Sequence, residues 1–266
     1  MVNMKDLPFD FPLELKQIIA KSLWENKTFG YSGTDVFKLT KNQKVMYLKI
    51  NQINSEFNLE KEKVILEWLD GKLPVPSVIF FDIKNETEFL LISEISGKSA
   101  HVFKKDAEKT RNIEILADGL QQIHSVDPKE CPFNNNPDKL LQLAELRLKS
   151  GGINPKQFDT RWQDEDPLEF FNKALKLKPT RYDFVFSHGD YCLPNVLINN
   201  SHLSGFIDWS YGGINDRYFD FAAVAWSIGY NYGEEWIPLF FEKYGLNDVD
   251  WDRIKFYQML NEFFQQ

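Results

Sequence analysis

The pattern of hydrophobic and polar positions divides the chain into a strand-rich first third and a helix-rich remainder. Residues 12–20 are amphipathic with a proline near their start, which predicts a short helix. Residues 55–69 carry apolar side chains at helical spacing, and Gly71 follows as a helix end. Strands are predicted over residues 24–30, 34–39, 45–50, 78–82 and 88–94. A five-stranded antiparallel sheet with a helix is therefore expected.

Beyond a break at Ser96 and Gly97, which we interpret as a hinge, the apolar periodicity becomes mostly helical. Helices are predicted over residues 107–124, 139–148, 168–177, 218–229 and 236–244. Strands first and helices afterwards are typical of an α+β protein. We expect two lobes of different character, residues 1–95 and residues 96–266.

The amino-acid composition argues against several classes of protein. Hydrophobic residues make up 43% of the 266 residues and aromatic residues 15%, which is ample for a packed core and argues against disorder. A net charge of −8 disfavours nucleic acid as a partner, because phosphate binding needs concentrated Lys and Arg. Cys131 and Cys192 are too few for a disulfide framework or a zinc cluster. With no signal-peptide pattern and no run of membrane-spanning length, a cytoplasmic location is expected.

Polar residues with possible chemistry gather where two apolar runs end. Residues 184–190 lead from an apolar strand into a polar turn at Asp190. Asn195 begins a second strand that turns at residues 199–202 and returns to Asp208. Because a hairpin places its two ends side by side, Asn195 and Asp208 should lie close together, with Asp190 at the same end.

Each of these residues alone is typical of turns, where Asp and Asn bond to nearby backbone. The combined spacing, with both segments between apolar runs, favours one shared site over three separate turns. Phosphoryl transfer requires one carboxylate to orient the attacking hydroxyl, and Asp190 fits that role. It also requires Mg²⁺ held by oxygen ligands, and Asn195 and Asp208 fit that role.

Four segments resemble the aminoglycoside phosphotransferases, above all the 3′-phosphotransferases, which are relatives of the eukaryotic protein kinases. These segments are residues 67–76, 188–195, 204–208 and 261–264, and the similarity spans nearly the whole chain. The resemblance implies a protein-kinase-like fold, ATP as phosphoryl donor and Mg²⁺, as two ions. It also implies transfer of the γ-phosphoryl group to the 3′-hydroxyl of an aminoglycoside antibiotic, which confers resistance.

Lys49 stands in the middle of an apolar strand, where its position alone leaves a solvated residue and a buried, paired cation equally open. The resemblance implies that Lys49 contacts the α- and β-phosphates and pairs with a helix glutamate. The matching glutamate is Glu60, and Glu62 is the weaker candidate. Tyr47 would stack on the adenine ring.

Residues 30–33 read on their own as a plain hairpin turn, and the resemblance makes them the loop that covers the phosphates, with Ser32 facing them. Backbone groups between Ser93 and Ile95 would bind the adenine edge. By the same comparison His188 is a structural residue of the catalytic loop and not a general base.

The residues expected to bind the acceptor match the family pattern less completely than those expected to bind the nucleotide. Glu262 and Phe264 match residues that contact the drug, although Gln265 and Gln266 follow here. Residues 151–170 correspond to the antibiotic-binding loop and contain five acidic residues, including Asp159 and Glu165, against two basic ones. This excess either attracts a polycationic acceptor or marks a solvated loop. We expect a monomer or weak dimer.

Five positions depart from the family pattern. Arginines are usual where this chain has Tyr211 and Trp226, and acids are common where it has Tyr230, Asn231 and Asn261. An alternative is therefore a kinase of a less cationic hydroxyl compound, such as a sugar or another antibiotic. A nucleotide-binding pseudokinase is the third hypothesis, and it is disfavoured because all the residues assigned to the nucleotide and the metal are present.

Overall fold

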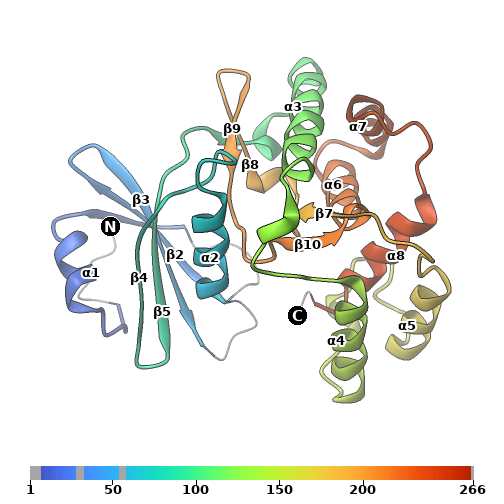
Figure 1. Ribbon diagram of the computed structural model, residues 1–266, viewed down its shortest axis with the longest axis horizontal. Helices are drawn as coiled ribbons and strands as arrows, with labels where there is room; N and C mark the ends of the chain where they lie inside the picture. Colours follow the sequence, from blue (N-terminus) through green and yellow to red (C-terminus); the bar gives the residue numbers. More distant parts are fainter. Residues whose placement is uncertain (1–6, 28–32, 54–57, 265–266) are drawn as a thin grey trace. The chain divides into compact units, whose positions relative to one another are not determined.

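A computed structural model describes residues 7–27, 33–53 and 58–264 of the chain (Figure 1). These residues form two compact units. The first contains the chain up to Ser96 together with Gly205–Ser210, and the second contains Gly97–Ser204 and the chain from Tyr211 onward. An antiparallel sheet with helices in the first unit and a mainly helical second unit confirm the predicted α+β class.

The sheet of the first unit has five strands in the order β1-β2-β3-β5-β4, and every neighbouring pair is antiparallel. The strands are β1 (Leu23–Asn26), β2 (Asp35–Lys41), β3 (Lys44–Gln52), β4 (Val78–Lys84) and β5 (Thr87–Ser93). Asn42 and Gln43 have positive φ between β2 and β3, which suits the twist of a two-residue hairpin turn. The predicted sheet is confirmed, except that β1 ends at Asn26 and residues 28–30 lie outside the described residues.

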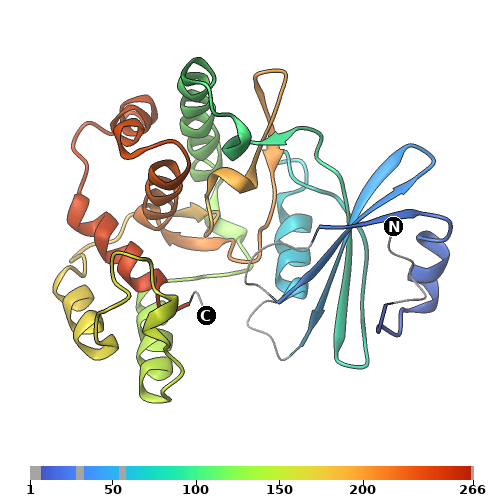
Figure 2. The same cartoon turned by 180° about the vertical axis from the view of Figure 1, so that it is seen from behind.

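Two helices cover opposite faces of this sheet, as both ribbon views show (Figures 1 and 2). Helix α1 (Leu13–Ile18) packs on the face that carries Leu48 and Ile50 of β3. Helix α2 (Leu59–Leu69) lies on the other face, which carries Lys49. The alternation of side chains along β3 thus separates an apolar core from a polar site.

The second unit is built mainly from helices. They are α3 (Asp106–His124), α4 (Pro137–Lys149), α5 (Pro167–Lys176), α6 (Arg217–Asn231), α7 (Ile237–Tyr244) and α8 (Trp251–Asn261). Short 3₁₀ turns are η2 (Ala100–Val102), η3 (Pro128–Glu130), η4 (Pro155–Gln157), η5 (Leu193–Asn195) and η6 (Glu234–Trp236). Helix α8 was not predicted, because it packs against α4, α5 and α6 and its buried residues do not form a single stripe.

Two small sheets carry the loops of interest. Strands β6 (Lys98–Ser99), β8 (Val196–Asn199) and β9 (His202–Phe206) form one sheet, and β8 and β9 are the predicted hairpin. Strand β7 (Phe184–Ser187) pairs antiparallel with β10 (Gly213–Asp216). Strand β10 was not predicted, because Gly, Asn and Asp are poor strand formers and only the pairing with β7 holds it extended.

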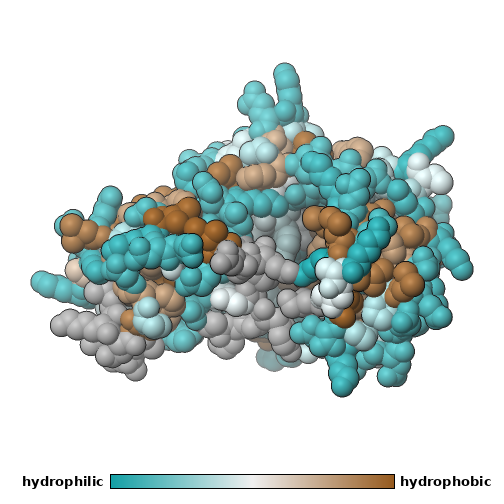
Figure 3. All heavy atoms as spheres, turned by 90° about the horizontal axis from the view of Figure 1, so that it is seen from below, coloured by the Kyte–Doolittle hydropathy of each residue, from teal (hydrophilic) through white to brown (hydrophobic). Residues whose placement is uncertain are grey.

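The surface is predominantly hydrophilic on the face drawn in Figure 3, where hydrophobic side chains form separate patches. Among residues 7–27, 33–53 and 58–264, no helix combines the length and the apolar character needed to cross a membrane.

Candidate active site

Lys49 is a buried cation with two acidic partners in the first unit. Its Nζ donates to both carboxylate oxygens of Glu62, at 2.7 and 2.9 Å, and to the carboxylate of Asp208. Burial alone would lower the pKa of the Lys49 ammonium, but the charges of Asp208 and Glu62 outweigh burial and raise it. Lys49 is therefore firmly protonated.

The partner glutamate is Glu62, which corrects the prediction of Glu60. On α2 the buried residues include Leu59, Glu62 and Ile65, three positions apart, so Glu62 lies in the stripe that faces the sheet. Glu60 lies outside that stripe and is exposed. The apolar spacing of the helix contained this signal, because only Glu62 is in phase with it.

Within the first unit, the segment that carries Asp208 is held in place by its backbone. Phe206 N–H donates to the Pro74 carbonyl at 3.0 Å, and a Cβ on Gly205 would lie only 2.5 Å from that carbonyl oxygen. Trp209 N–H donates to Glu62 at 3.4 Å. Asp208 itself adopts a left-handed conformation, φ 63°, with its side chain about half exposed. This conformation is uncommon outside glycine and is found at functional sites.

In the second unit, Asp190 and Asn195 are joined within the loop after β7. Asn195 Nδ2 donates to Asp190 Oδ2 at 2.8 Å and to the Asp190 carbonyl at 3.0 Å. These bonds use both protons of the amide nitrogen and leave its oxygen as the atom for another ligand. The imidazole of His188 is fully buried, and its Nδ1 accepts from Asp190 N–H at 3.3 Å. Asn195 thus orients the Asp190 carboxylate, while His188 and Asn195 hold the Asp190 backbone.

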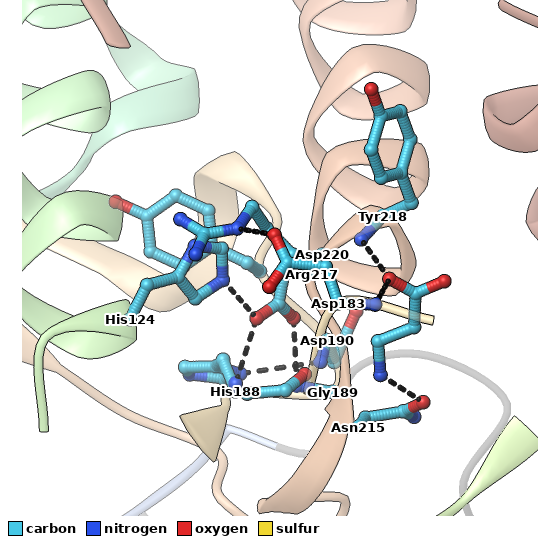
Figure 4. Close-up of polar contacts among 12 residues, drawn as sticks. His124, Asp183, His188, Gly189, Asp190, Asn215, Arg217, Tyr218 and Asp220 are labelled. Atoms are coloured by element: carbon cyan, nitrogen blue, oxygen red, sulfur yellow. Dashed lines mark hydrogen bonds and ion pairs between the residues drawn. The ribbon is translucent and has the colours of Figure 1, made fainter. Parts of the chain in front are cut away.

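Asp220 of α6 supports this loop, and the sequence analysis missed it (Figure 4). Its buried carboxylate accepts from His188 N–H at 3.0 Å and from Gly189 N–H at 2.9 Å, and it lies 3.0 Å from His124 Nε2. Burial alone would raise the pKa of Asp220, but hydrogen bonding to His124 and the other contacts lower it. A lone acid within the apolar stretch of α6 was the available signal.

Tyr211 packs directly on the catalytic loop. A Cβ on Gly189 would lie 2.3 Å from the Tyr211 carbonyl oxygen, and Gly189 has φ 83°, so only glycine fits there. Asn135 Nδ2 donates to the same carbonyl at 2.7 Å. Burial, followed by the charge of Asp190, raises the pKa of the Tyr211 phenol to about 12. The phenol is thus close enough to Asp190 to sense its charge.

Glu262 and Asp159, two of the predicted acceptor residues, contact each other. Asp159 N–H donates to Glu262 Oε2 at 2.7 Å, and burial raises the pKa of Glu262 to about 7. The Asp159 carboxylate accepts from Arg161 Nε at 2.9 Å and from Trp226 Nε1 at 2.8 Å. Burial alone would raise the pKa of Asp159, but the hydrogen bonds from Arg161 and Trp226 lower it to about 2. Asp159 therefore stays ionised and already has a cationic partner.

The remaining predicted residues take less specific positions. Glu165 forms an ion pair with Lys173 at 2.5 Å. The ring of Phe264 lies 5.7 Å from the Arg147 guanidinium. Tyr47 is on β3, with its pKa raised mainly by burial, and Ser93 N–H donates to the Ser77 carbonyl at 2.9 Å. Ile95 lies beside Gly205, since its methyl Cγ2 would be 3.0 Å from a Cβ built on that glycine. Ser32 lies outside the described residues.

A family model described as the phosphotransferase enzyme family matches residues 28–257. The chain belongs to this family. An aminoglycoside 3′-phosphotransferase of Niallia circulans is 33% identical over 263 residues, which cover 98% of this chain and 100% of that relative. One of Enterococcus faecalis is 32% identical, covering 94% of this chain and 97% of the relative. The expected resemblance is confirmed, and the chain is a phosphotransferase enzyme.

Solved structures agree with this assignment. An aminoglycoside 3′-phosphotransferase of type VIII superposes with a TM-score of 0.83 at 23% identity, covering 94% of this chain and 96% of that one, and shows the shared fold. The aminoglycoside phosphotransferase APH(3″)-Id of Streptomyces rimosus, in complex with ADP and streptomycin, superposes with a TM-score of 0.78 at 25% identity. The superposed residues cover 94% of this chain and 95% of the Streptomyces rimosus enzyme.

Proposed function

We propose that this phosphotransferase transfers the γ-phosphoryl group of ATP to the 3′-hydroxyl of an aminoglycoside antibiotic and thereby confers resistance. The observation that carries the proposal is the buried Lys49–Glu62 pair, with Asp208 on the same ammonium. A structural protein would gain little from burying the Lys49–Glu62 ion pair, whereas phosphate binding requires such a fixed cation. The 3′-phosphotransferases at 32–33% identity and the neighbour that binds ADP and streptomycin support the acceptor and a nucleotide donor.

Asp190 orients the acceptor hydroxyl and takes its proton, while Lys49 neutralises charge on the phosphates. The acceptor oxygen forms a bond to the γ-phosphorus, and the bond from that phosphorus to the bridging oxygen breaks, so ADP leaves. No covalent enzyme intermediate forms, and the rate enhancement comes from positioning and electrostatics. His188, Gly189 and Asp220 hold the loop that positions Asp190.

Asp208 and Asn195 would hold Mg²⁺, which would neutralise phosphate charge when bound. The donor set supports this role, because Asp208 offers a half-exposed carboxylate and Asn195 an amide oxygen that accepts no hydrogen bond from the described residues. Mg²⁺ commonly uses one or two such protein oxygens and completes its shell with water and phosphate. No group of three or more His, Cys, Asp or Glu suited to a metal occurs in the described part of the chain.

A kinase of a less cationic hydroxyl compound is the second candidate. The observation that favours it is that Asp159 and Glu165, the expected acceptor carboxylates, already pair with Arg161 and Lys173. Less negative charge is then left to attract a polycation.

The test is ADP release by the purified protein with MgATP and a panel of kanamycin, neomycin and neutral sugars. We expect aminoglycosides to stimulate turnover, and phosphorus-coupled NMR of the product to locate the phosphate on the 3′-oxygen. Stimulation by neutral sugars alone would exclude the proposed acceptor. Asp190→Asn is the control, and its kcat should fall by about 10³-fold or more with little change in ATP binding.

A further inference from the structure

Helix α6 combines support of the catalytic loop with an exposed aromatic pair. Asp220 binds the backbone of His188 and Gly189, and the Ser227 hydroxyl accepts from Leu193 N–H at 2.9 Å. These contacts fix one side of α6 to the loop that carries Asp190. A side chain on α6 next to Ser227 is therefore held at a defined position relative to Asp190.

Trp226, next to Ser227, stacks on Tyr230 one turn later along α6. The ring centroids are 5.3 Å apart and the planes differ by 9°. The residues nevertheless remain 39% and 77% exposed. Two parallel aromatic rings in water present a rigid apolar surface, and burying such a surface is favourable.

Trp226 is also fixed in orientation by the loop that contains Asp159. Its Nε1 donates to Asp159 Oδ2 at 2.8 Å, and Asp159 N–H donates in turn to Glu262 at 2.7 Å. The aromatic surface is thus connected to two of the predicted acceptor carboxylates, Asp159 and Glu262. Because Arg161 also binds Asp159, a cationic ligand would find this carboxylate already neutralised.

We propose that Trp226 and Tyr230 form an acceptor subsite that binds a saturated ring through its apolar C–H face. This inference rests on the proposed function, since it concerns the acceptor of the same reaction. Hydroxylated six-membered rings of sugars and aminocyclitols have such a face, with polar groups around the rim. Recognition here depends on stacking more than on the number of positive charges.

The experiment compares the wild type with Trp226→Ala, Trp226→Phe and Tyr230→Ala in steady-state kinetics with kanamycin and MgATP. Removing either ring should raise the acceptor KM by roughly 2- to 12-fold, while the ATP KM changes less than about twofold. Trp226→Phe should recover most of the affinity because it keeps an aromatic face. Trp251→Ala, which removes an exposed tryptophan from α8, is the matched control and should leave both KM values unchanged.

The salt dependence of the acceptor affinity is a second measurement. Contacts between exposed charges weaken strongly between 50 mM and 500 mM salt, whereas stacking contacts do not. The loss of acceptor affinity caused by Tyr230→Ala should therefore be the same at both salt concentrations. Tyr230 is 77% exposed, so its replacement should fold normally, which a thermal unfolding scan checks.

The inference is overturned if wild type turns over kanamycin and both alanine variants keep its acceptor KM. It is also overturned if Trp226→Phe is as impaired as Trp226→Ala, because the indole–Asp159 bond would then be the contribution of Trp226. Failure of the proposed function looks different: the wild type itself would release no ADP with any aminoglycoside.

Discussion

Replacing Glu62 by glutamine tests the assignment of the Lys49 partner. Glutamine has nearly the same shape and keeps one acceptor oxygen, but it removes the charge that faces the buried ammonium of Lys49. Breaking one side of a buried ion pair costs about 3–5 kcal/mol. Asp208 still faces Lys49, so we expect the lower end, about 3 kcal/mol.

This loss has a thermal and a kinetic consequence. At roughly 2–4 °C per kcal/mol for a chain of this size, the Tm of Glu62→Gln should fall by roughly 6–12 °C. Because Glu62 also accepts from Trp209 N–H, beside Asp208, the phosphate-binding groups should lose their fixed positions. We expect kcat/KM for ATP to fall about 100-fold, measured by ADP release at saturating acceptor.

Glu60→Gln is the matched control, since it makes the same chemical change two residues earlier on the same helix. Glu60 is exposed, so its replacement should change the free energy of unfolding by less than about 0.5 kcal/mol and leave ATP kinetics unaltered. Equal losses in the two variants, or a larger loss in Glu60→Gln, would refute the assignment of Glu62.

Three further predictions concern the second unit. In steady-state kinetics, Asp220→Asn should lower kcat by at least about 10²-fold and change the ATP KM little. The reason is that the new amide N–H groups of the asparagine would face the backbone N–H donors that the carboxylate now accepts from. Gly189→Ala should lower kcat similarly, since the new Cβ would lie 2.3 Å from the Tyr211 carbonyl oxygen, and near-normal turnover would contradict that contact. The Glu262 carboxyl has a pKa of about 7 against an ordinary 4.5, so the folded state binds its proton more tightly than the unfolded state. Its stabilising effect is complete below pH 4.5 and is lost as the pH rises through 7. Urea unfolding at pH 5 and pH 8 should show Glu262→Gln gaining stability relative to wild type at the higher pH, by up to about 3 kcal/mol, and a pH-independent difference would contradict the raised pKa.

Elements with regular apolar spacing, or with turn residues at their ends, could be predicted from the amino-acid sequence alone. Runs of strand-forming residues separated by turn residues predicted the five-stranded sheet, because turn residues mark where each strand ends. The hairpin of β8 and β9 was readable for the same reason. Helix α8 and strand β10 were not, because burial on several sides erases the period and because strand pairing can hold residues that disfavour strands.

The pairing of charged side chains, by contrast, depends on how distant segments of the chain pack together. Lys49 could be identified along the chain, and the apolar spacing of α2 favours Glu62 over Glu60, but the contact itself depends on the rotation of α2 against the sheet. The support of the catalytic loop by Asp220 joins positions about 30 residues apart, and no local pattern encodes that distance. The Asp159 carboxylate likewise accepts a hydrogen bond from Trp226 Nε1, which lies 67 positions further along the chain. A sequence lists charges, whereas their partners depend on packing between segments that are distant along the chain.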